Sequence, residues 1–132
     1  MRFLPLTIAF AAAGLLVAGS AQAAQKTPAE RLAKALEGRT AGAPVDCITQ
    51  HNIQSSQIID NTAILYSVGR TLYVNTPASG ANFLDSSDIM VTDTHSPQLC
   101  SIDIVRLVDS GSRMPSGSVG LGKFVPYTKP KG

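Results

Sequence analysis

The chain has 132 residues, of which 44% are hydrophobic and 15% are charged. This length is enough for one domain, and the apolar content excludes disorder driven by low hydrophobicity and high charge. Lys and Arg number 11 against 9 Asp and Glu, which excludes a strongly basic nucleic-acid binder and an acidic tail. With three Tyr, four Phe and no Trp, the composition also argues against an aromatic platform that stacks sugars or bases.

Residues 1–23 are predicted to be a secretory signal peptide. Arg2 gives a positive start, residues 3–17 are nearly all apolar, and Ala21 and Ala23 supply the small residues that a signal peptidase reads. The apolar run is shorter than the about 20 residues of a membrane span and is interrupted by a proline and a glycine. An uncleaved N-terminal anchor is the alternative. We therefore expect export, with a mature chain that begins near residue 24.

The two cysteines, Cys47 and Cys100, are expected to form a disulfide, because an exported chain meets an oxidising compartment. Such a bond would close a loop of about 50 residues and contribute about 4 kcal/mol in the chain-entropy model. A redox pair and a metal site are the alternatives. The chain has no Cys-x-x-Cys, and zinc would need four ligands from two Cys and two His.

Residues 24–44 are predicted to form a short helix followed by a linker. Thr27 and Glu30 have the spacing of a capping box, a proline stands at the first helical position, and Gly38 follows as a C-terminal cap. Apolar residues recur at helical spacing between these signals. We therefore expect a helix over Pro28–Glu37 that must dock on another element, since ten residues are marginal alone in water.

Residues 45–127 are predicted to form a β-rich domain. It begins with two tight hairpins made by Ser55–Ile59, Thr62–Val68 and Thr71–Asn75. Two-residue turns would place Tyr66 opposite Tyr73, Leu65 opposite Val74, and Ile58 opposite Ala63.

One face of this meander would then be apolar and suited to a core, with Ile58, Ala63, Leu65, Leu72 and Val74. The other face is mixed, with Ile64, Tyr66, Val68, Thr71, Tyr73 and Asn75, and it is a candidate surface for the helix. Both faces are therefore expected to be partly buried, and a register error of one residue would exchange them.

Further strands are predicted over Ile89–Asp93, Ile102–Val108 and Val119–Val125, the last closed by Pro126, with a loop over Gly111–Gly117. Residues 128–132 are expected to be a flexible tail. Short strands at regular spacing predict a mainly β fold, a small antiparallel barrel or sandwich of about six to seven short strands with one N-terminal α-helix.

The cross-strand pair Tyr66 and Tyr73, with Asn75 nearby and Phe83 in the following loop, is the one predicted constellation that suits a binding surface. Tyrosine offers rigid contact area with a polar atom at its end. The alternative is that the pair packs under the helix or a loop, because aromatic cross-strand pairs commonly stabilise sheets.

A catalytic site would have to be built on His51 or His95, the two histidines. Asp93, His95 and Ser96 offer an acid, a base and a nucleophile, but neighbours along an extended segment point to opposite sides. No G-x-S-x-G motif is present. His51, His95, Asp46 and Asp93 lack the spacing of metal ligands. We expect no enzyme activity, no metal and no cofactor, with a small periplasmic hydrolase or metal-dependent enzyme using His51 or His95 as the alternative.

Two further motifs are weak. Residues 85–88, Asp-Ser-Ser-Asp, lack the central glycine and terminal glutamate of a calcium loop. The glycines of residues 117–122 are in the wrong order for a nucleotide-binding loop and suit a bulge or bend in a strand instead.

Several strings resemble a group of small exported alphaproteobacterial proteins, sphingomonad-like, that have no assigned activity. They are Leu36-Glu37-Gly38-Arg39, Pro44-Val45-x-Cys47-Ile48, Ile58-Ile59-Asp60-Asn61-Thr62-Ala63-Ile64, Thr71-Leu72-Tyr73-Val74-Asn75, Gln98-Leu99-Cys100 and Gly122-Lys123-Phe124-Val125-Pro126-Tyr127. The resemblance implies a periplasmic or secreted location in a Gram-negative bacterium and a shared two-cysteine framework, and it brings no active site.

The sequence therefore predicts a non-catalytic binding or structural protein of the cell envelope. Its partner is expected to be an envelope protein or a small ligand, not a nucleic acid. Contact with a membrane is expected only through an uncleaved signal peptide.

Overall fold

The computed structural model describes residue 14 and residues 26–130, so the predicted signal peptide lies outside the described residues, Gly14 excepted. The fold is mainly β. In chain order the elements are α1 (Pro28–Ala35), β1 (Thr40–Ala41), β2 (Cys47–Thr49), the 3-10 turn η1 (Gln50–Asn52), β3 (Ser55–Ile59), β4 (Ala63–Val68), β5 (Thr71–Asn75), the 3-10 turn η2 (Ala81–Phe83), β6 (Asp88–Thr92), β7 (Gln98–Cys100), β8 (Ile104–Asp109), β9 (Pro115–Gly120) and β10 (Phe124–Thr128).

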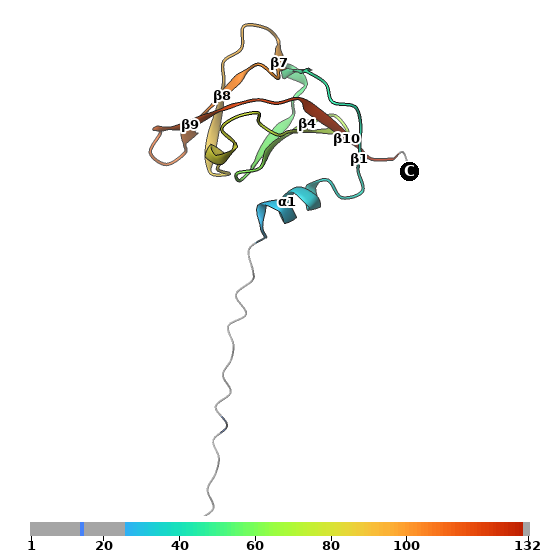
Figure 1. The fold of residues 1–132 in the computed structure, drawn as a ribbon, viewed down its shortest axis with the longest axis horizontal. Helices are drawn as coiled ribbons and strands as arrows, with labels where there is room; N and C mark the ends of the chain where they lie inside the picture. Colours follow the sequence, from blue (N-terminus) through green and yellow to red (C-terminus); the bar gives the residue numbers. More distant parts are fainter. Residues whose placement is uncertain (1–13, 15–25, 131–132) are drawn as a thin grey trace, which may run out of the picture.

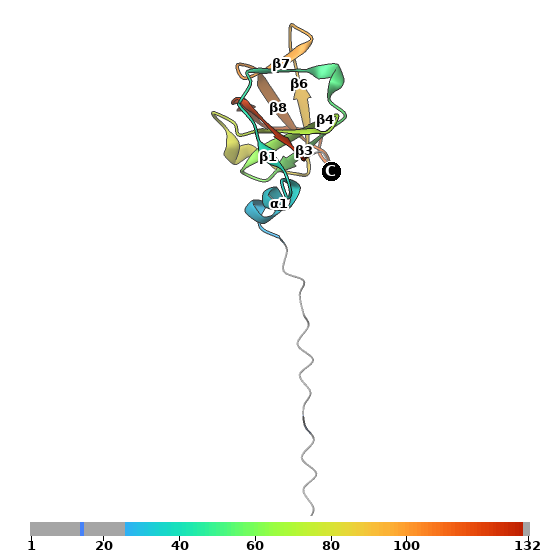
Figure 2. The same ribbon diagram turned by 90° about the vertical axis from the view of Figure 1, so that its right-hand side faces the viewer.

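The strands form three antiparallel sheets, with the orders β1-β10-β5-β4-β3, β2-β7 and β6-β8-β9. Within the described residues these sheets stay separate, so the arrangement is closer to a sandwich than to a closed barrel. In both views α1 lies below the five-stranded sheet and β7 lies at the opposite end of the molecule (Figures 1 and 2). The predicted fold class is therefore confirmed, with more and shorter strands than expected.

The helix begins and ends close to where its caps predict. The hydroxyl of Thr27 accepts a hydrogen bond from the Glu30 N–H at 3.2 Å, and proline stands at the start of the helix. Leu36 is the C-terminal cap, and Gly38 follows with a φ of 74°, a conformation that glycine adopts without steric cost. The helix itself therefore spans Pro28–Ala35, two residues less than predicted.

The larger core lies between the three sheets, and each of them contributes side chains to it. Its buried members are Ile48, Ile58, Ile64, Tyr66, Leu84, Leu99, Val105, Leu107, Val119, Leu121 and Phe124. A smaller core lies on the other face of the five-stranded sheet, where Leu32, Ala35 and Leu36 of the helix region pack against it. Its buried members are Ile59, Ala63, Leu65, Leu72 and Val74. Both faces of the central hairpins are therefore buried, as expected.

The predicted register is confirmed in one hairpin and wrong in the other. Tyr66 pairs with Tyr73 across the Gly69-Arg70 turn, as predicted. In the first hairpin, however, Ala63 pairs with Ile59 instead of Ile58. The connection has three residues, because Asn61 adopts a φ of 54° and the Thr62 N–H donates to the Ile59 carbonyl at 3.1 Å. Because of this extra residue, the Ile58 side chain points into the larger core, and the Ile59 side chain lies in the smaller core beneath the helix.

The helix does not cover the mixed face that was its candidate surface. It packs on the face of Leu65 and Leu72, and the face of Ile64 and Tyr66 supports the larger core. The reason is that the mixed face needs more cover than an eight-residue helix can give, and the other two sheets supply it. The short apolar side of α1 packs instead on the aliphatic residues of the opposite face.

The last predicted strand, Val119–Val125, is divided between two sheets. β9 ends at Gly120 in the three-stranded sheet, and β10 begins at Phe124 in the five-stranded sheet. Pro126 does not close the strand but lies inside β10, opposite Tyr73. Its carbonyl accepts from the Gly42 N–H at 2.7 Å, so its nitrogen faces the same side, just beyond the end of β1. The missing N–H therefore costs no bond to β5.

Other segments also differ from their predicted bounds. The predicted linker contains β1, whose two residues pair with the end of β10. The predicted loop Gly111–Gly117 ends earlier, because β9 begins at Pro115, and β8 begins at Ile104 instead of residue 102.

Candidate functional site

The predicted disulfide is present and joins two directly paired strands. Cys47 of β2 lies opposite Cys100 of β7, and their Cα atoms are 4.0 Å apart. The next pair in the register, Ile48 and Leu99, is buried in the larger core. The bond therefore holds a short two-stranded sheet against the end of the core that lies farthest from α1 (Figure 1).

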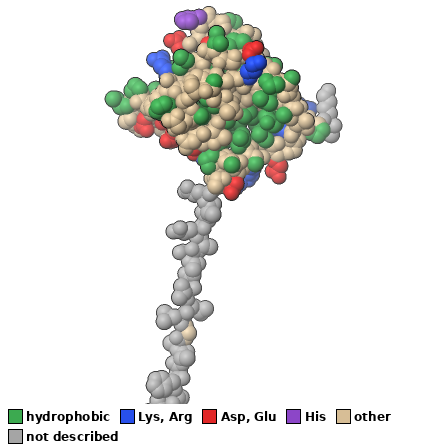
Figure 3. All heavy atoms as spheres, in the orientation of Figure 1, with side chains coloured by type: hydrophobic (Ala, Val, Ile, Leu, Met, Phe, Trp, Pro, Cys, Tyr) green, Lys and Arg blue, Asp and Glu red, His purple; other side chains and the backbone are tan. Residues whose placement is uncertain are grey.

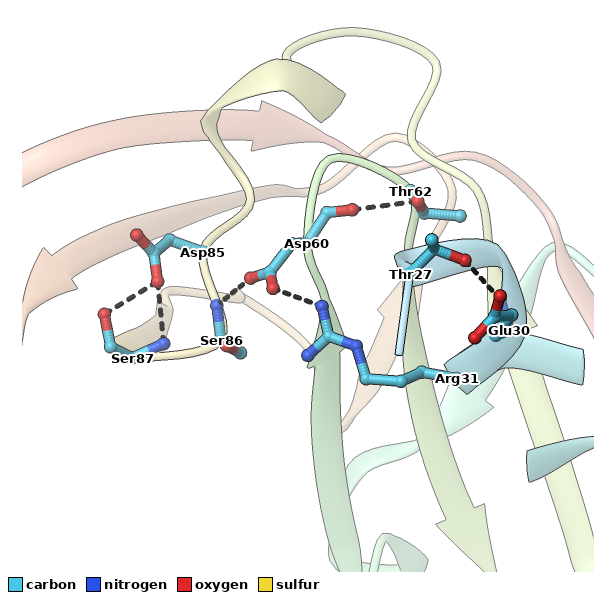
Figure 4. Close-up of polar contacts among 8 residues, drawn as sticks. All are labelled: Thr27, Glu30, Arg31, Asp60, Thr62, Asp85, Ser86 and Ser87. Atoms are coloured by element: carbon cyan, nitrogen blue, oxygen red, sulfur yellow. Dashed lines mark hydrogen bonds and ion pairs between the residues drawn. The ribbon is translucent and has the colours of Figure 1, made fainter. Parts of the chain in front are cut away.

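A polar network fixes α1 to the turn between β3 and β4. The Arg31 guanidinium donates to one carboxylate oxygen of Asp60, and the other oxygen accepts the Ser86 N–H at 2.6 Å (Figure 4). The Arg31 hydrogen bond, followed by that of Ser86, lowers the pKa of the Asp60 carboxyl below its usual value. One carboxylate thus joins the helix, the first hairpin and the segment that leads into β6.

Two adjoining cavities run between β3 and β6. The first has a volume of about 510 Å³ and is lined by residues 56–58, residues 88–90, Arg31 and Ser86. The second has a volume of about 270 Å³ and is lined by Gln50, Ile53, Ser56, Tyr66, Met90, Thr92 and Leu99. Ser56 and Met90 line both cavities. We call the two together the β3–β6 cleft.

Both walls of the β3–β6 cleft are edges of sheets. β3 pairs with β4 on one side and ends the five-stranded sheet, whereas β6 pairs with β8 and ends the three-stranded sheet. Within residues 26–130, no backbone hydrogen bond joins β3 to β6. An edge strand presents a row of N–H and C=O groups that have no strand partner. The cleft therefore has peptide donors and acceptors on both of its walls.

Tyr66 lines this cleft, and its hydroxyl is buried. Its side chain comes from β4, its ring packs edge-to-face on Phe124 with centroids 5.8 Å apart, and the residue is 4% exposed. The Tyr66 hydroxyl has no hydrogen-bond partner among the described residues, and burial raises the pKa of this phenol far above its usual value. A buried hydroxyl without a partner costs about 1–3 kcal/mol. A ligand that accepts a hydrogen bond from it would recover that cost.

A second group without a partner belongs to Arg31, which lines the first cavity. Its Nε is buried and makes no hydrogen bond within the described part of the chain, although the guanidinium contacts Asp60 through another nitrogen. The cleft therefore has one unsatisfied donor on a residue lining each of its two cavities.

The four predicted binding residues do not come together on one surface. Tyr66 and Asn75 are buried, and Tyr73 is half-buried against the larger core. Asn75 uses its side chain internally, since its amide donates to the Gly122 carbonyl and accepts from the Gly122 N–H. Phe83 is exposed over 47% of its surface. Tyr66 lines the β3–β6 cleft, and Phe83 lies elsewhere.

Phe83 stands beside an apolar groove on the three-stranded sheet. The groove has a volume of about 530 Å³ and is lined by Phe83, Val91, Ile104, Arg106, Leu107, Val108, Pro115, Gly117 and Ser118. A Cβ at Gly117 would lie 2.8 Å from the Phe83 ring, so the glycine lets the ring approach the strand. Hydrophobic side chains reach the surface at the end of the molecule that carries β9 (Figure 3).

The two histidines are exposed. His51 lies in η1, and His95 lies in the connection between β6 and β7, where the Gln50 side chain contacts Thr94. Histidine atoms project at the top of Figure 3, at the end of the molecule that carries β7. Within the described residues, no group of three or more His, Cys, Asp or Glu is placed to hold a metal ion.

The other weak motifs have structural explanations. The Asp85 carboxylate accepts from the N–H and hydroxyl of Ser87, which closes a local turn (Figure 4). A Cβ at Gly122 would lie 2.3 Å from the Thr76 carbonyl oxygen, so a close approach of two backbone segments requires glycine there. The Asp85 motif therefore belongs to a local turn, whereas Gly117 and Gly120 lie in β9, where the pairing with β8 shifts register between Leu107 and Val108.

The sequence reasoning missed most of the β3–β6 cleft, including Arg31, Ser56 and Thr92. No local pattern marks these residues, because the cleft exists only where two strands from different hairpins come to face each other. The one available signal was Tyr66, whose hydroxyl lies within the mainly apolar strand β4. A polar atom at such a position has to find a partner or adjoin a cavity.

Within the described residues, no helix has the length and apolar content that crossing a membrane requires. Comparison with known proteins finds no matching family model, no matching curated protein and no matching solved structure. The resemblance to small exported alphaproteobacterial proteins therefore stays a prediction.

Proposed function

We propose that this chain is an exported, non-catalytic binding protein of the cell envelope, and that the β3–β6 cleft is its binding site. The predicted signal peptide supports export, and the Cys47–Cys100 bond is of the kind that persists in an oxidising compartment. A periplasmic location in a Gram-negative bacterium is the specific expectation.

One observation carries the binding site. The buried Tyr66 hydroxyl has no partner among the described residues, and it belongs to a residue that lines a cleft between two free strand edges. Buried polar groups in folded proteins are nearly always paired, so an unpaired one beside a cavity favours a bound molecule as its partner. The surrounding Gln50, Ser56 and Thr92 supply further polar groups, whereas Ile53, Met90 and Leu99 supply apolar contact.

Export is tested by producing the full chain in a Gram-negative host and separating the periplasmic fraction by osmotic shock. We expect the protein in that fraction with an N-terminus near Ala24. Protein that keeps residue 1 and sediments with membranes would contradict this part of the proposal and favour the uncleaved anchor.

Binding is tested by native mass spectrometry of the protein purified from envelope extract without denaturation. The wild type is expected to carry an added mass. The Ser56→Lys variant, which places a charged chain in the cleft, should lose that mass, and Ser55→Lys should keep it. Both serines are exposed on β3, but Ser55 lines neither cavity. Equal loading of the two variants, or an unloaded wild type, would count against the site.

A further inference from the structure

We infer that the β3–β6 cleft takes an extended peptide segment, which enters as an added strand and pairs through its backbone. This inference rests on the proposed function, because it names the class of partner that the same site binds. The partner chemistry is that of an uncharged polypeptide backbone in β conformation.

The two walls of the cleft determine this chemistry. β3 and β6 each end an antiparallel sheet and each present N–H and C=O groups without a strand partner. A small ligand could satisfy a few of these groups. An extended backbone has donors and acceptors along both of its edges, so it can pair with a strand on each side at the repeat of a sheet. It is the one common ligand chemistry that complements both walls along their length.

The lining residues fix the size of the segment. The first cavity faces residues 56–58 of β3 and 88–90 of β6, and the second continues as far as Thr92. The wall formed by β3 therefore has three lining residues, and the wall formed by β6 extends over the five positions 88–92. The longer wall corresponds to a segment of about five residues, or roughly 17 Å of extended chain.

The second cavity fixes the preferred side chain. Its volume of about 270 Å³ has apolar walls from Ile53, Met90 and Leu99, and Tyr66 is the residue with the unpartnered hydroxyl. We therefore expect one aliphatic side chain of medium size to enter this cavity, with a backbone carbonyl accepting from the Tyr66 hydroxyl. Arg31, whose Nε also has no partner, would take a second carbonyl in the first cavity.

The geometry favours a single extended segment over a second folded copy of this chain. The strand edges lie on two walls of one cleft, whereas a folded copy presents a sheet whose neighbouring layer lies about 10 Å away. Such a body can pair with one wall from outside but cannot enter between the two. Dimerisation through β3 or β6 is therefore a distinct outcome of the test.

The probe is a blocked heptapeptide, acetyl-Thr-Val-Thr-Leu-Thr-Val-Thr-amide, added to the isotope-labelled mature protein and followed by NMR. The matched control is the same peptide N-methylated at alternate residues, which keeps the side chains but removes backbone donors. We expect chemical-shift changes confined to the amides of β3, β6 and the cleft lining. The N-methyl groups can stand at the odd or at the even residues, which gives two control peptides. The control that binds better should still bind at least about tenfold more weakly than the unmethylated peptide.

The chain variants give an independent comparison on the same probe. Ser56→Lys should weaken heptapeptide binding by about tenfold, whereas Ser55→Lys should change it by less than about twofold. Thermal unfolding of both variants checks that they fold alike. If Ser56→Lys fails to fold, the comparison of methylated and unmethylated peptide on the wild type decides alone.

Four results would overturn the inference. The first three are the absence of any shift at about 2 mM peptide, equal affinity for the N-methylated control, and shifts that map to the groove beside Phe83. A dimer of the wild type that Ser56→Lys dissociates would overturn it in favour of a second copy. If the peptide fails but envelope-purified protein still carries a mass that depends on Ser56, the cleft binds another class of ligand. In that case the proposed function stands without this inference.

Discussion

Asn75 on β5 and Gly122, in the connection between β9 and β10, hold each other through a reciprocal pair of hydrogen bonds. The Asn75 Nδ2 donates to the Gly122 carbonyl at 2.7 Å, and its Oδ1 accepts from the Gly122 N–H at 2.9 Å. Asn75 is fully buried. The Asn75 amide therefore pairs with the backbone of Gly122 in the way that a neighbouring strand would. Gly122 lies where the chain leaves the three-stranded sheet and enters the five-stranded one.

Replacing Asn75 by alanine is expected to lower the free energy of unfolding by about 1–3 kcal/mol, because the N–H and the carbonyl of the half-buried Gly122 would both lose their partner. Urea unfolding measures this loss. Asn82→Ala is the matched control, since Asn82 is an exposed asparagine in η2. Equal stability of the two variants would show that water replaces the Asn75 amide without cost.

Loss of the disulfide is expected to lower stability by about 4 kcal/mol, the chain-entropy value for a loop with the observed sequence separation of 53. The Cys47→Ser, Cys100→Ser double variant removes the bond. β2 and β7 form a sheet of only two strands, so the amides of Ile48 and Leu99 should exchange with solvent first. Hydrogen exchange and urea unfolding measure the two effects. Unchanged protection of these amides would show that core packing alone holds the pair.

The elements fixed by short-range rules were predictable from the sequence. The turn at Gly69-Arg70 sets the register of Tyr66 against Tyr73, and Thr27 and Gly38 set the helix limits to within two residues. The first hairpin was misaligned because Asn61 allows either a two-residue or a three-residue connection, and sequence does not distinguish them. The helix face was misassigned because both faces of β4 are apolar, which removes the alternation that would identify the solvent side.

The candidate site was much less predictable than the fold. Tyr66 was singled out for its possible surface contact, yet it is relevant as a buried hydroxyl. The walls of the cleft depend on how β3 and β6, which belong to different sheets, are placed relative to each other. No rule about neighbouring residues specifies the distance between these two strands. Asn75 shows the same limit, since its partner Gly122 is 47 residues away in the chain. Long-range pairing of polar groups decides which residues serve the fold and which face a cavity.

Tyr66→Phe is expected to raise the free energy of unfolding at neutral pH by about 1–3 kcal/mol, because it removes a buried hydroxyl that has no partner. The same change should weaken heptapeptide binding if that hydroxyl donates to the peptide. Denaturant unfolding and NMR titration measure the two effects. Tyr73→Phe is the control, since it alters the cross-strand partner and keeps Tyr66. A loss of stability in Tyr66→Phe would mean that the hydroxyl is satisfied in the free protein, for example by water.

The stability of the protein at alkaline pH tests whether the Tyr66 phenol is buried. Burial raises the pKa of Tyr66 in the folded state, so the neutral form is favoured by folding. The contribution of the neutral phenol to the free energy of unfolding is complete below the pKa of about 10 in the unfolded state. It is lost as the pH rises through the pKa of the folded state. We therefore expect the stability of the wild type to fall more steeply above about pH 10 than that of Tyr66→Phe. Parallel curves from urea unfolding at each pH would show that the phenol is not desolvated.

The stability of the protein at acidic pH tests the contact between Arg31 and Asp60. The pKa of Asp60 is lowered by the Arg31 and Ser86 hydrogen bonds, so folding favours the charged form. The contribution of the Asp60 carboxylate to the free energy of unfolding is present above the pKa of about 3.9 in the unfolded state. It is lost as the pH falls through the pKa of the folded state. Asp60→Asn is expected to cost about 1 kcal/mol at neutral pH, a small value because both side chains are partly exposed.

Below about pH 4 the difference between wild type and Asp60→Asn should shrink, because the wild-type carboxylate becomes protonated. Asp85→Asn is the matched control, since Asp85 contacts Ser87 within its own turn and does not reach the helix. Hydrogen exchange of the Leu36 amide, which donates to the Leu32 carbonyl, reports whether α1 loosens. If Asp60→Asn leaves helix exchange unchanged, the packing of Leu32 and Leu36 on the sheet is sufficient to dock α1, and the ion pair serves the cleft rather than the helix.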